Sequence, residues 1–358
     1  MTTILYKNYY PKLITDKKYI LAGFDLDHTI ILPKSGNVFP KDNDDWKLWK
    51  PIVKTKLREL NKNKENLIVI FSNQKGLKIS NNDFLKKIDN IQKELDINFI
   101  FMAALEDDNY RKPRIGMFKE LKTLYKFDKN KSFYVGDMAG RKYDKYDTDL
   151  KFALNIQKKS LTNLKFMTPE EYFLGEKKEK QTLSGYLLDK SLDSYDIPTI
   201  PNNNKSMIII SGYPGSGKST LANNIINNHM YKIQFDFISK DMFTGSKLQF
   251  NKKLITSLEN SKNVIVEGLY STNNARNELK ELAKKYGYHT TYIHVNTSYD
   301  TSYHLNLYRS IYGDKDKVPE IVYMKYKKDF ENININDWNK LIMYHPDISK
   351  KINKYYLF

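Results

Sequence analysis

The segment SMIIISGYPGSGKST, residues 206–220, constrains the fold of this chain more than any other stretch. The run SMIIIS, with four apolar residues between two serines, is typical of a buried parallel strand and leads directly into the pattern G-x-x-x-x-G-K-[ST]. The helical stretch LANNIINNH follows at 221–229. A glycine-rich turn between a strand and a helix lets main-chain N–H groups surround phosphate groups. We therefore expect a parallel α/β domain that binds a nucleoside triphosphate.

Each residue type in this loop has an expected task. Lys218 is expected to reach the β and γ phosphates, and Ser219 to bind Mg²⁺. The remaining contacts to the nucleotide are expected from the rest of the motif: Gly212, Gly215, Ser216, Gly217 and Thr220. The motif predicts nucleotide binding but leaves the acceptor of the phosphoryl group open.

Polar residues downstream of the loop are candidates for the chemistry of the same domain. Asp236 and Asp241 lie in QFDFISKDMFTGS (234–246), and a carboxylate there can take a proton from an attacking hydroxyl. Glu267 lies in the apolar run VIVEG, at a Walker-B-like position. Arg309 lies in a basic, mobile-looking segment, 304–331. It is expected either to close over the phosphates as a lid or to be an exposed helix arginine.

A second apolar run, YILAGF at 19–24, ends in DLDHT and raises a different chemistry. Asp25, Asp27 and Thr29 follow the strand, where parallel sheets place their active sites. Two carboxylates at such an edge suggest Mg²⁺ and phosphate chemistry, in which one attacks phosphorus and the other transfers protons. The alternative is a surface turn that carries two acids and a threonine.

Three later features favour the phosphate interpretation. Ser72 ends the apolar run LIVIFS (67–72), where its hydroxyl can hold a phosphate, and Asp137 ends SFYVGD (132–137), where it can bind Mg²⁺. Lys112, in RKPRIGM, can neutralise a phosphoryl group. Two of them have a simpler alternative on their own: Asp137 as a helix cap, and Lys112 as a solvated lysine.

Composition sets the frame for both sites. The 358 residues suggest two domains, joined by a charged, proline-containing linker at about 176–206. The chain has no cysteine, and it shows neither a signal-peptide core nor a transmembrane run, so we expect an intracellular protein, nuclear or cytoplasmic. A formal net charge of +17 indicates either nucleic-acid binding or the lysine-rich composition of an AT-rich genome.

Taken in order, DLDHT, FSNQ, RKP and VGDMAGR resemble the haloacid dehalogenase superfamily. With RKPRIGM, FALNI and FMTPEEYF, they resemble more closely the polynucleotide kinase 3′-phosphatase family. The resemblance implies that Asp25 is the nucleophile and Asp27 the general acid and base. It also implies Ser72 and Lys112 as phosphate-binding residues. Asp25, Asp27 and Asp137 would be the magnesium ligands of this site, and Thr29 would support the loop. Arg141 would contact the DNA strand or form a structural salt bridge.

The second half resembles the kinase part of the same family. SKDMFTGS resembles the family segment after the P-loop, with Asp241 at the general-base position, and VPEIVYMKYKKDFE resembles the family stretch Val/Ile-Pro … Tyr … Phe-Glu. Arg309 falls on the lid arginine and Arg276 on a basic residue that helps to hold the acceptor phosphates. The chain departs from the family in one place, where EGLYS (267–271) replaces Asp-Asn-Thr-Asn and leaves the acceptor contacts open.

The resemblance implies an α/β enzyme of two domains, a haloacid dehalogenase-like Rossmannoid phosphatase followed by a P-loop kinase with a parallel sheet. The expected boundaries are 1–175, a linker at 176–204, and 205–358. The first domain would remove 3′-phosphates and the second would phosphorylate 5′-hydroxyls with ATP and Mg²⁺, which makes nucleic-acid ends ligatable in DNA repair. DNA ends are the expected substrate of a monomer without a phosphopeptide-binding scaffold domain or a membrane segment. The alternatives are a phosphatase fused to a nucleoside-type kinase for small molecules, and a non-catalytic nucleic-acid-binding scaffold.

Overall fold

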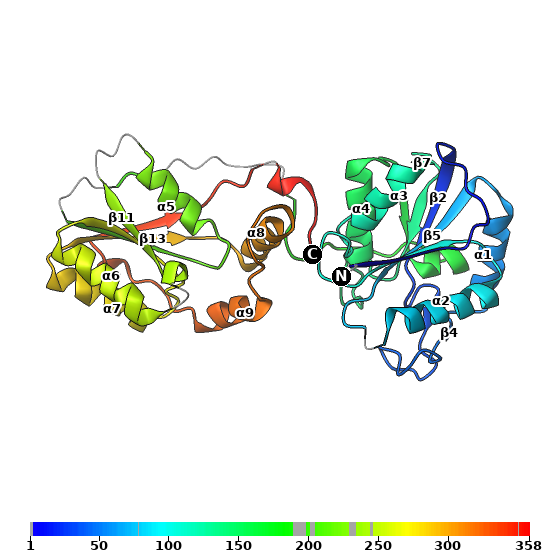
Figure 1. Ribbon diagram of the computed structural model, residues 1–358, viewed down its shortest axis with the longest axis horizontal. Helices are drawn as coiled ribbons and strands as arrows, with labels where there is room; N and C mark the ends of the chain where they lie inside the picture. The colour runs from blue at the N-terminus through cyan, green and yellow to red at the C-terminus, as the bar shows by residue number, and fades with distance from the viewer. Residues whose placement is uncertain are drawn as a thin grey trace. The chain divides into compact units, whose positions relative to one another are not determined.

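The computed structural model describes residues 3–77, 79–188, 198–200, 205–228, 234–243, 246–349 and 351–358. It divides into two compact units, Met1–Leu188 with Lys354–Phe358, and Asp189–Asn353. Figure 1 shows both units as helices packed around a sheet. Of the expected linker, 189–197 and 201–204 lie outside the described residues. The boundaries predicted at 175 and 205 did not anticipate that residues 354–358 belong to the first unit.

The first unit is built on a mainly parallel sheet. Its strand order is β1 (Ile4–Asn8), β6 (Ile100–Ala104), β5 (Asn66–Asn73), β2 (Lys18–Phe24), β8 (Phe133–Val135) and β9 (Lys165–Met167). Only β1 runs antiparallel in this order, against β6. The short β7 (Lys126–Phe127) also pairs with β2, while β3 (Ile31–Leu32) and β4 (Lys47–Leu48) form a separate ribbon.

Helices cover both faces of this sheet, which explains why its central strands β2, β5 and β6 are mainly apolar. Ala22 and Phe24 of β2 pack with α1 (Ile52–Lys62) and α2 (Asn81–Leu95). On the opposite face, Tyr19 and Leu21 pack with α3 (Gly116–Leu124) and α4 (Thr148–Lys159). A short π-helical turn, η1 (Glu170–Leu174), follows β9. The sandwich leaves the carboxyl ends of β2, β5 and β8 at one edge, where their polar residues meet.

The second unit has a wholly parallel sheet. Its order is β11 (Phe235–Ser239), β12 (Asn263–Glu267), β10 (Ser206–Ser211), β13 (His289–Val295) and β14 (Lys340–Tyr344). The helices are α5 (Lys218–Ile226), α6 (Lys247–Glu259), α7 (Asn273–Lys285), α8 (Tyr299–Tyr312) and α9 (Glu320–Asp329). Short 3₁₀ turns lie at η2 (Lys240–Phe243), η3 (Ile335–Asp337) and η4 (Ile352–Lys354). Separate apolar clusters on the two faces of the sheet hold α6 and α7 on one face and α5 on the other.

The structure confirms the predicted fold class, an α/β chain with two domains and a parallel-sheet P-loop unit. The strand expected at 19–24 is not the first of the chain, because β1 precedes it. Arg309 lies in the regular helix α8, and its role in a mobile lid stays a prediction. Among the helices of the described ranges, none is long and apolar enough to cross a membrane.

Candidate active sites

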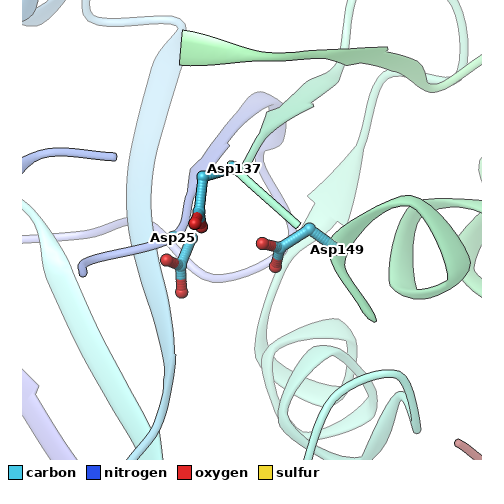
Figure 2. A group of neighbouring side chains, drawn as sticks. All are labelled: Asp25, Asp137 and Asp149. Atoms are coloured by element: carbon cyan, nitrogen blue, oxygen red, sulfur yellow. The ribbon is translucent and has the colours of Figure 1, made fainter. Parts of the chain in front are cut away.

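Three carboxylates meet at the edge of the first sheet. Asp25 follows β2, Asp137 follows β8, and Asp149 lies in the first turn of α4. One oxygen of each lies within 4.8 Å of the others, and Figure 2 shows the three side chains converging. Asp149 can approach because residue 136 is glycine: a Cβ there would lie 2.5 Å from the Asp149 carboxyl carbon. Oxygen ligands in this arrangement are suited to a divalent cation.

Lys112 neutralises part of this cluster. Its Nζ donates hydrogen bonds to Asp25 (2.5 Å), to Asp149 (2.7 Å) and to the hydroxyl of Tyr134 (2.9 Å). The lysine is only 4% exposed, so it is not the solvated residue that the sequence left as an alternative. Asn73, at the end of β5, fixes the Lys112 main chain by accepting from its N–H (2.8 Å) and donating to its carbonyl (3.1 Å).

Burial and the mutual repulsion of the acids raise the pKa values of carboxylates in this cluster. Burial, with Asp149 and Asp27 nearby, raises the pKa of Asp25 to about 7, although Lys112 opposes the shift. Burial and Asp25 raise the pKa of Asp137 to about 9. Burial alone would lower the pKa of Lys112, but Asp149 and Asp25 together raise it above its usual value. A bound cation would relieve this repulsion and keep the carboxylates ionised.

Gln74 links two residues that the sequence predicted separately. Its side-chain NH₂ donates to Asp27 (2.7 Å) and to the Ser72 hydroxyl (2.8 Å). Gln74 therefore holds Asp27 close to Ser72. Within the described ranges, Asp27 is not part of the three-carboxylate group. Thr29 is fully buried, and its hydroxyl has no hydrogen-bond partner among the described residues.

Arg141 lies in structural contacts. Its guanidinium forms ion pairs with Asp144 (2.9 Å) and Glu170 (2.8 Å), and donates to the Asp137 carbonyl (3.0 Å). Only 6% of the residue is exposed. Of the two alternatives given by the sequence, this geometry favours the salt bridge over a contact with a DNA strand. The arginine instead fastens the loop that carries Asp137.

The glycine-rich loop of the second unit has the expected conformation. Gly212, Gly215 and Gly217 have φ angles of +147°, +72° and +96°, which residues with a Cβ rarely adopt. Lys218 folds back and donates to the carbonyls of Gly212 (3.2 Å) and Tyr213 (2.6 Å). Burial, together with Arg309, lowers the pKa of Lys218 to about 8, although Glu267 opposes the shift.

The other loop residues line the same turn. Ser219 donates to Glu267 at the end of β12 (2.8 Å), so both residues stand where a P-loop protein holds its metal. Ser216 is buried with no partner for its hydroxyl among the described residues, while Thr220 is exposed in the first turn of α5. Burial raises the pKa of Glu267.

The two acids near β11 have different surroundings. Asp236, within the strand, accepts from Ser257 of α6 (2.8 Å) and lies 3.6 Å from the amine of Lys262. Asp241 lies after the strand, in η2, and is exposed. Asp236 is thus held by α6, whereas the Asp241 carboxylate remains accessible to a ligand. The contacts favour Asp241 as the residue that could meet an acceptor hydroxyl.

Arg309 lies on α8, which packs against the glycine-rich loop. Its guanidinium donates to Asn306 (3.3 Å), and its Nε has no partner among the described residues. The hydroxyl of Tyr323, on α9, donates to the Pro214 carbonyl (2.7 Å), and the ring of Tyr213 stacks near it. The Tyr323 contacts hold α9 against the loop, while Ser302 and Asn306 of α8 lie beside Gly215.

Arg276 is 2% exposed and donates mainly to carbonyl groups. Its acceptors are the main-chain oxygens of Tyr270, Ser271, Glu331 and Asn332, and the side chain of Asn273. The guanidinium therefore joins the EGLYS loop to the segment after α9. The expected contact with acceptor phosphates is not favoured by this arrangement.

Two family models match this chain. One, described as polynucleotide kinase 3 phosphatase, matches residues 20–173, and the other, described as an AAA domain, matches residues 207–333. A bifunctional polynucleotide phosphatase/kinase of Schizosaccharomyces pombe is 33% identical over 92% of this chain and 80% of its own length. The chain belongs to the family of bifunctional polynucleotide phosphatase/kinases.

Further relatives agree with this assignment, which confirms the resemblance predicted from the sequence motifs. A putative bifunctional polynucleotide phosphatase/kinase of Acanthamoeba polyphaga mimivirus is 32% identical over 87% of this chain and 80% of its own length. A polynucleotide 3′-phosphatase of Saccharomyces cerevisiae is 29% identical and matches 43% of this chain and 87% of its own length.

Four polar contacts in this phosphatase/kinase were not found by sequence reasoning: those made by Asp149, Tyr134, Gln74 and Tyr323. Asp149 lies in YDTDLKFALN, at the start of a helix rather than at a strand end, and so escaped the strand-end criterion. Gln74 was quoted in FSNQ but given no role. An acid in the first turn of a helix is a usable signal, because such a helix end attracts negative charge.

Proposed function

We propose that this chain removes 3′-phosphates and phosphorylates 5′-hydroxyls at nucleic-acid ends, with ATP as the phosphoryl donor. The observation that carries the proposal is that one chain holds both a buried Asp–Lys–Asp cluster at a sheet edge and a complete P-loop. Relatives named for the two activities match most of its length.

In the proposed phosphatase step, a carboxylate oxygen of Asp25 attacks phosphorus. The bond between phosphorus and the 3′ oxygen breaks, and Asp27 donates a proton to that leaving oxygen. Water then attacks the aspartyl phosphate, Asp27 takes its proton, and inorganic phosphate leaves. Gln74 orients Asp27 through its 2.7 Å hydrogen bond and holds the Ser72 hydroxyl beside it, where that hydroxyl can donate to a phosphate oxygen.

The acid cluster fits a magnesium ion. Asp25, Asp137 and Asp149 offer hard oxygen ligands within 4.8 Å of one another. The pKa values of Asp25 and Asp137 are raised by burial and by neighbouring acids, so a bound cation would stabilise their ionised forms. A bound Mg²⁺ would neutralise charge on the phosphoryl group. Lys112 supplies further positive charge at the same point and favours the ionised form of the Asp25 carboxylate, which is the form that attacks.

In the proposed kinase step, Asp241 takes the proton of a 5′-hydroxyl. The oxygen of that hydroxyl attacks the γ phosphorus, and ADP leaves. Lys218 and the main-chain N–H groups of the loop bind the phosphates, and Ser219 with Glu267 would hold a second Mg²⁺. Arg309 bonds to Asn306, which lies beside Gly215 of the loop, and from there the arginine can stabilise the charge of the transferring group.

Nucleic acid as the substrate rests on the relatives and on charge. The formal net charge of +17 favours a polyanion. The proposal includes DNA ends as the substrate, in line with the names of the relatives, and a monomer as the enzyme. If several phosphates are bound, oligonucleotide affinity should fall steeply as the salt concentration rises. A flat salt profile would instead indicate a small-molecule substrate.

Paired single-site variants test the assignment of each activity to its unit. Asp25→Asn should abolish release of phosphate from a 3′-phosphorylated oligonucleotide and leave 5′ phosphorylation unchanged. Lys218→Ala should do the reverse. Each variant is the folding control for the other, so loss of both activities in either variant, or retention of the targeted one, contradicts the assignment.

A further inference from the structure

The segment Lys354–Phe358 is part of the first unit although it follows the second in sequence. Tyr356 and Leu357 are 8% and 2% exposed, so the segment is embedded rather than draped over the surface. The buried side chain of Asn155, on α4, donates to the Tyr356 carbonyl (2.8 Å) and accepts from its N–H (2.9 Å). This reciprocal pair holds a main chain in the way that a neighbouring strand would.

Lys151 fixes the other end of the segment. Its Nζ donates to the main-chain oxygens of Phe358 (2.7 Å) and Ser184 (2.7 Å), and forms an ion pair with Asp147 (3.0 Å). The Phe358 ring covers Gly185, where a Cβ would lie 2.8 Å from it. One buried lysine therefore joins the segment, the 184–185 turn and the residue that precedes α4.

The same residues lead directly to the phosphatase site. The Asn155 amide also donates to the carbonyl of Pro113 (2.9 Å), which follows Lys112 in the chain. Asp149, which holds Lys112 at 2.7 Å, lies two residues before Lys151 on the same helix. Without the segment, Asn155 and Lys151 would lose partners for groups that are now almost wholly buried. Two contacts around Lys112 therefore come from α4, beside those from Asn73, Asp25 and Tyr134, so a shift of this helix would disturb the position of the lysine.

We propose that residues 354–358 are a positioning segment of the phosphatase site, which acts through Asn155 and Lys151 to hold α4, Lys112 and Asp149 in register. This inference rests on the proposed 3′-phosphatase function. It makes the phosphatase unit discontinuous: residues 1–188 lack one of its parts. Active-site groups lose efficiency when displaced by less than about 1 Å, so a missing positioning segment should lower kcat more than substrate binding.

The test is deletion of residues 354–358 from the full chain, with both activities measured on one preparation. The phosphatase kcat should fall at least tenfold with KM within about twofold, while the kinase rate stays within about twofold as the folding control. The peptide Lys-Tyr-Tyr-Leu-Phe, added in trans, should restore phosphatase activity along a saturable curve. The same peptide with an N-methyl group on its second tyrosine, the counterpart of Tyr356, lacks the N–H that Asn155 accepts and should not. Lys354→Ala changes an exposed residue and is the matched control.

Deletion that leaves the phosphatase kcat within threefold would overturn the inference, as would a selective loss that no peptide concentration restores. If deletion also removes kinase activity, Asn155→Asp decides, because it keeps the acceptor for Tyr356 and removes both donated bonds. A lowered kcat with an unchanged kinase rate supports the inference, and a lowered melting temperature with an unchanged kcat refutes it. Absence of phosphatase activity in the unaltered chain is a separate result, which contradicts the proposed function itself.

Discussion

Asp149 offers the sharpest test of how the phosphatase site is held together. Its carboxylate accepts from Lys112 (2.7 Å), from the Tyr134 hydroxyl (2.7 Å) and from the Met138 N–H (3.1 Å). Asp149→Asn keeps the size of the side chain but removes its charge. The change turns the ion pair with Lys112 into a hydrogen bond from the charged amine to a neutral amide oxygen, and takes away one of the three candidate metal ligands.

The magnitude follows from these contacts. A hydrogen bond to a charged group contributes about 1.5–3 kcal/mol. The cost should stay below the roughly 3–5 kcal/mol of a fully broken buried ion pair, because Lys112 keeps Asp25 at 2.5 Å. If the loss falls on the transition state, 3 kcal/mol corresponds to about a hundredfold fall in kcat. We expect a fall of at least that size in 3′-phosphate release, since the metal ligand is lost as well.

The assay measures inorganic phosphate from a 3′-phosphorylated oligonucleotide at saturating Mg²⁺, with 5′ phosphorylation measured in parallel. Asp128→Asn is the control, because Asp128 also accepts three hydrogen bonds but lies beside Lys18, at the amino-terminal end of β2. It should leave kcat unchanged. Phosphatase activity of Asp149→Asn within tenfold of the unaltered chain would refute the role derived for this carboxylate.

Three further outcomes are expected in the second unit. Asp241→Asn should slow 5′ phosphorylation at least a hundredfold and leave ATP affinity intact. Asp236→Asn should mainly lower the stability of the fold, because it weakens the contact with Ser257. A larger effect on the rate at Asp236 would show that Asp236, and not Asp241, is the general base. The pKa of Lys218 is about 8 in the free protein, and a bound phosphate should raise it, so near pH 8 the binding of ATP should take up roughly half a proton. Calorimetry in buffers of different ionisation enthalpy should show this uptake. Lys218→Met should abolish it. Burial lowers the pKa of His294 to about 4, so between about pH 4 and 6.5 the unfolded chain binds more protons than the folded chain. The free energy of unfolding should therefore fall by up to about 3 kcal/mol as the pH drops through that window. His294→Gln should flatten the pH dependence of the melting temperature, and an unchanged profile would contradict this role of His294.

The parts of this structure that the sequence could predict are those fixed by local pattern. Asp25, Ser72 and Asp137 each end an apolar strand, and parallel strands place such ends together. The glycine-rich loop was also predictable, because its positive φ angles favour glycine at the positions where the sequence has it. In both sites, strand ends carried the information.

Residues placed by packing between helices and sheet could not be read in this way. Asp149 reaches the site because α4 packs closely over Gly136, and Arg276 is buried because carbonyl groups from two separate segments surround it. The first strand, ILYKN, is short and half polar, and it was missed because its pairing with β6 is a long-range contact. Residues 354–358 give no local signal that they belong to the first unit.

The central claim is that one chain acts on both kinds of nucleic-acid end. The most direct measurement uses a single oligonucleotide with a 5′-hydroxyl and a 3′-phosphate, incubated with γ-labelled ATP and Mg²⁺ and analysed by mass. The account predicts a product with labelled phosphate at the 5′ end and a free 3′-hydroxyl, formed in DNA and RNA versions at rates that reveal the preferred substrate. An oligonucleotide that is bound yet unchanged at both ends, or untouched while phosphorylated nucleosides are processed, would contradict it.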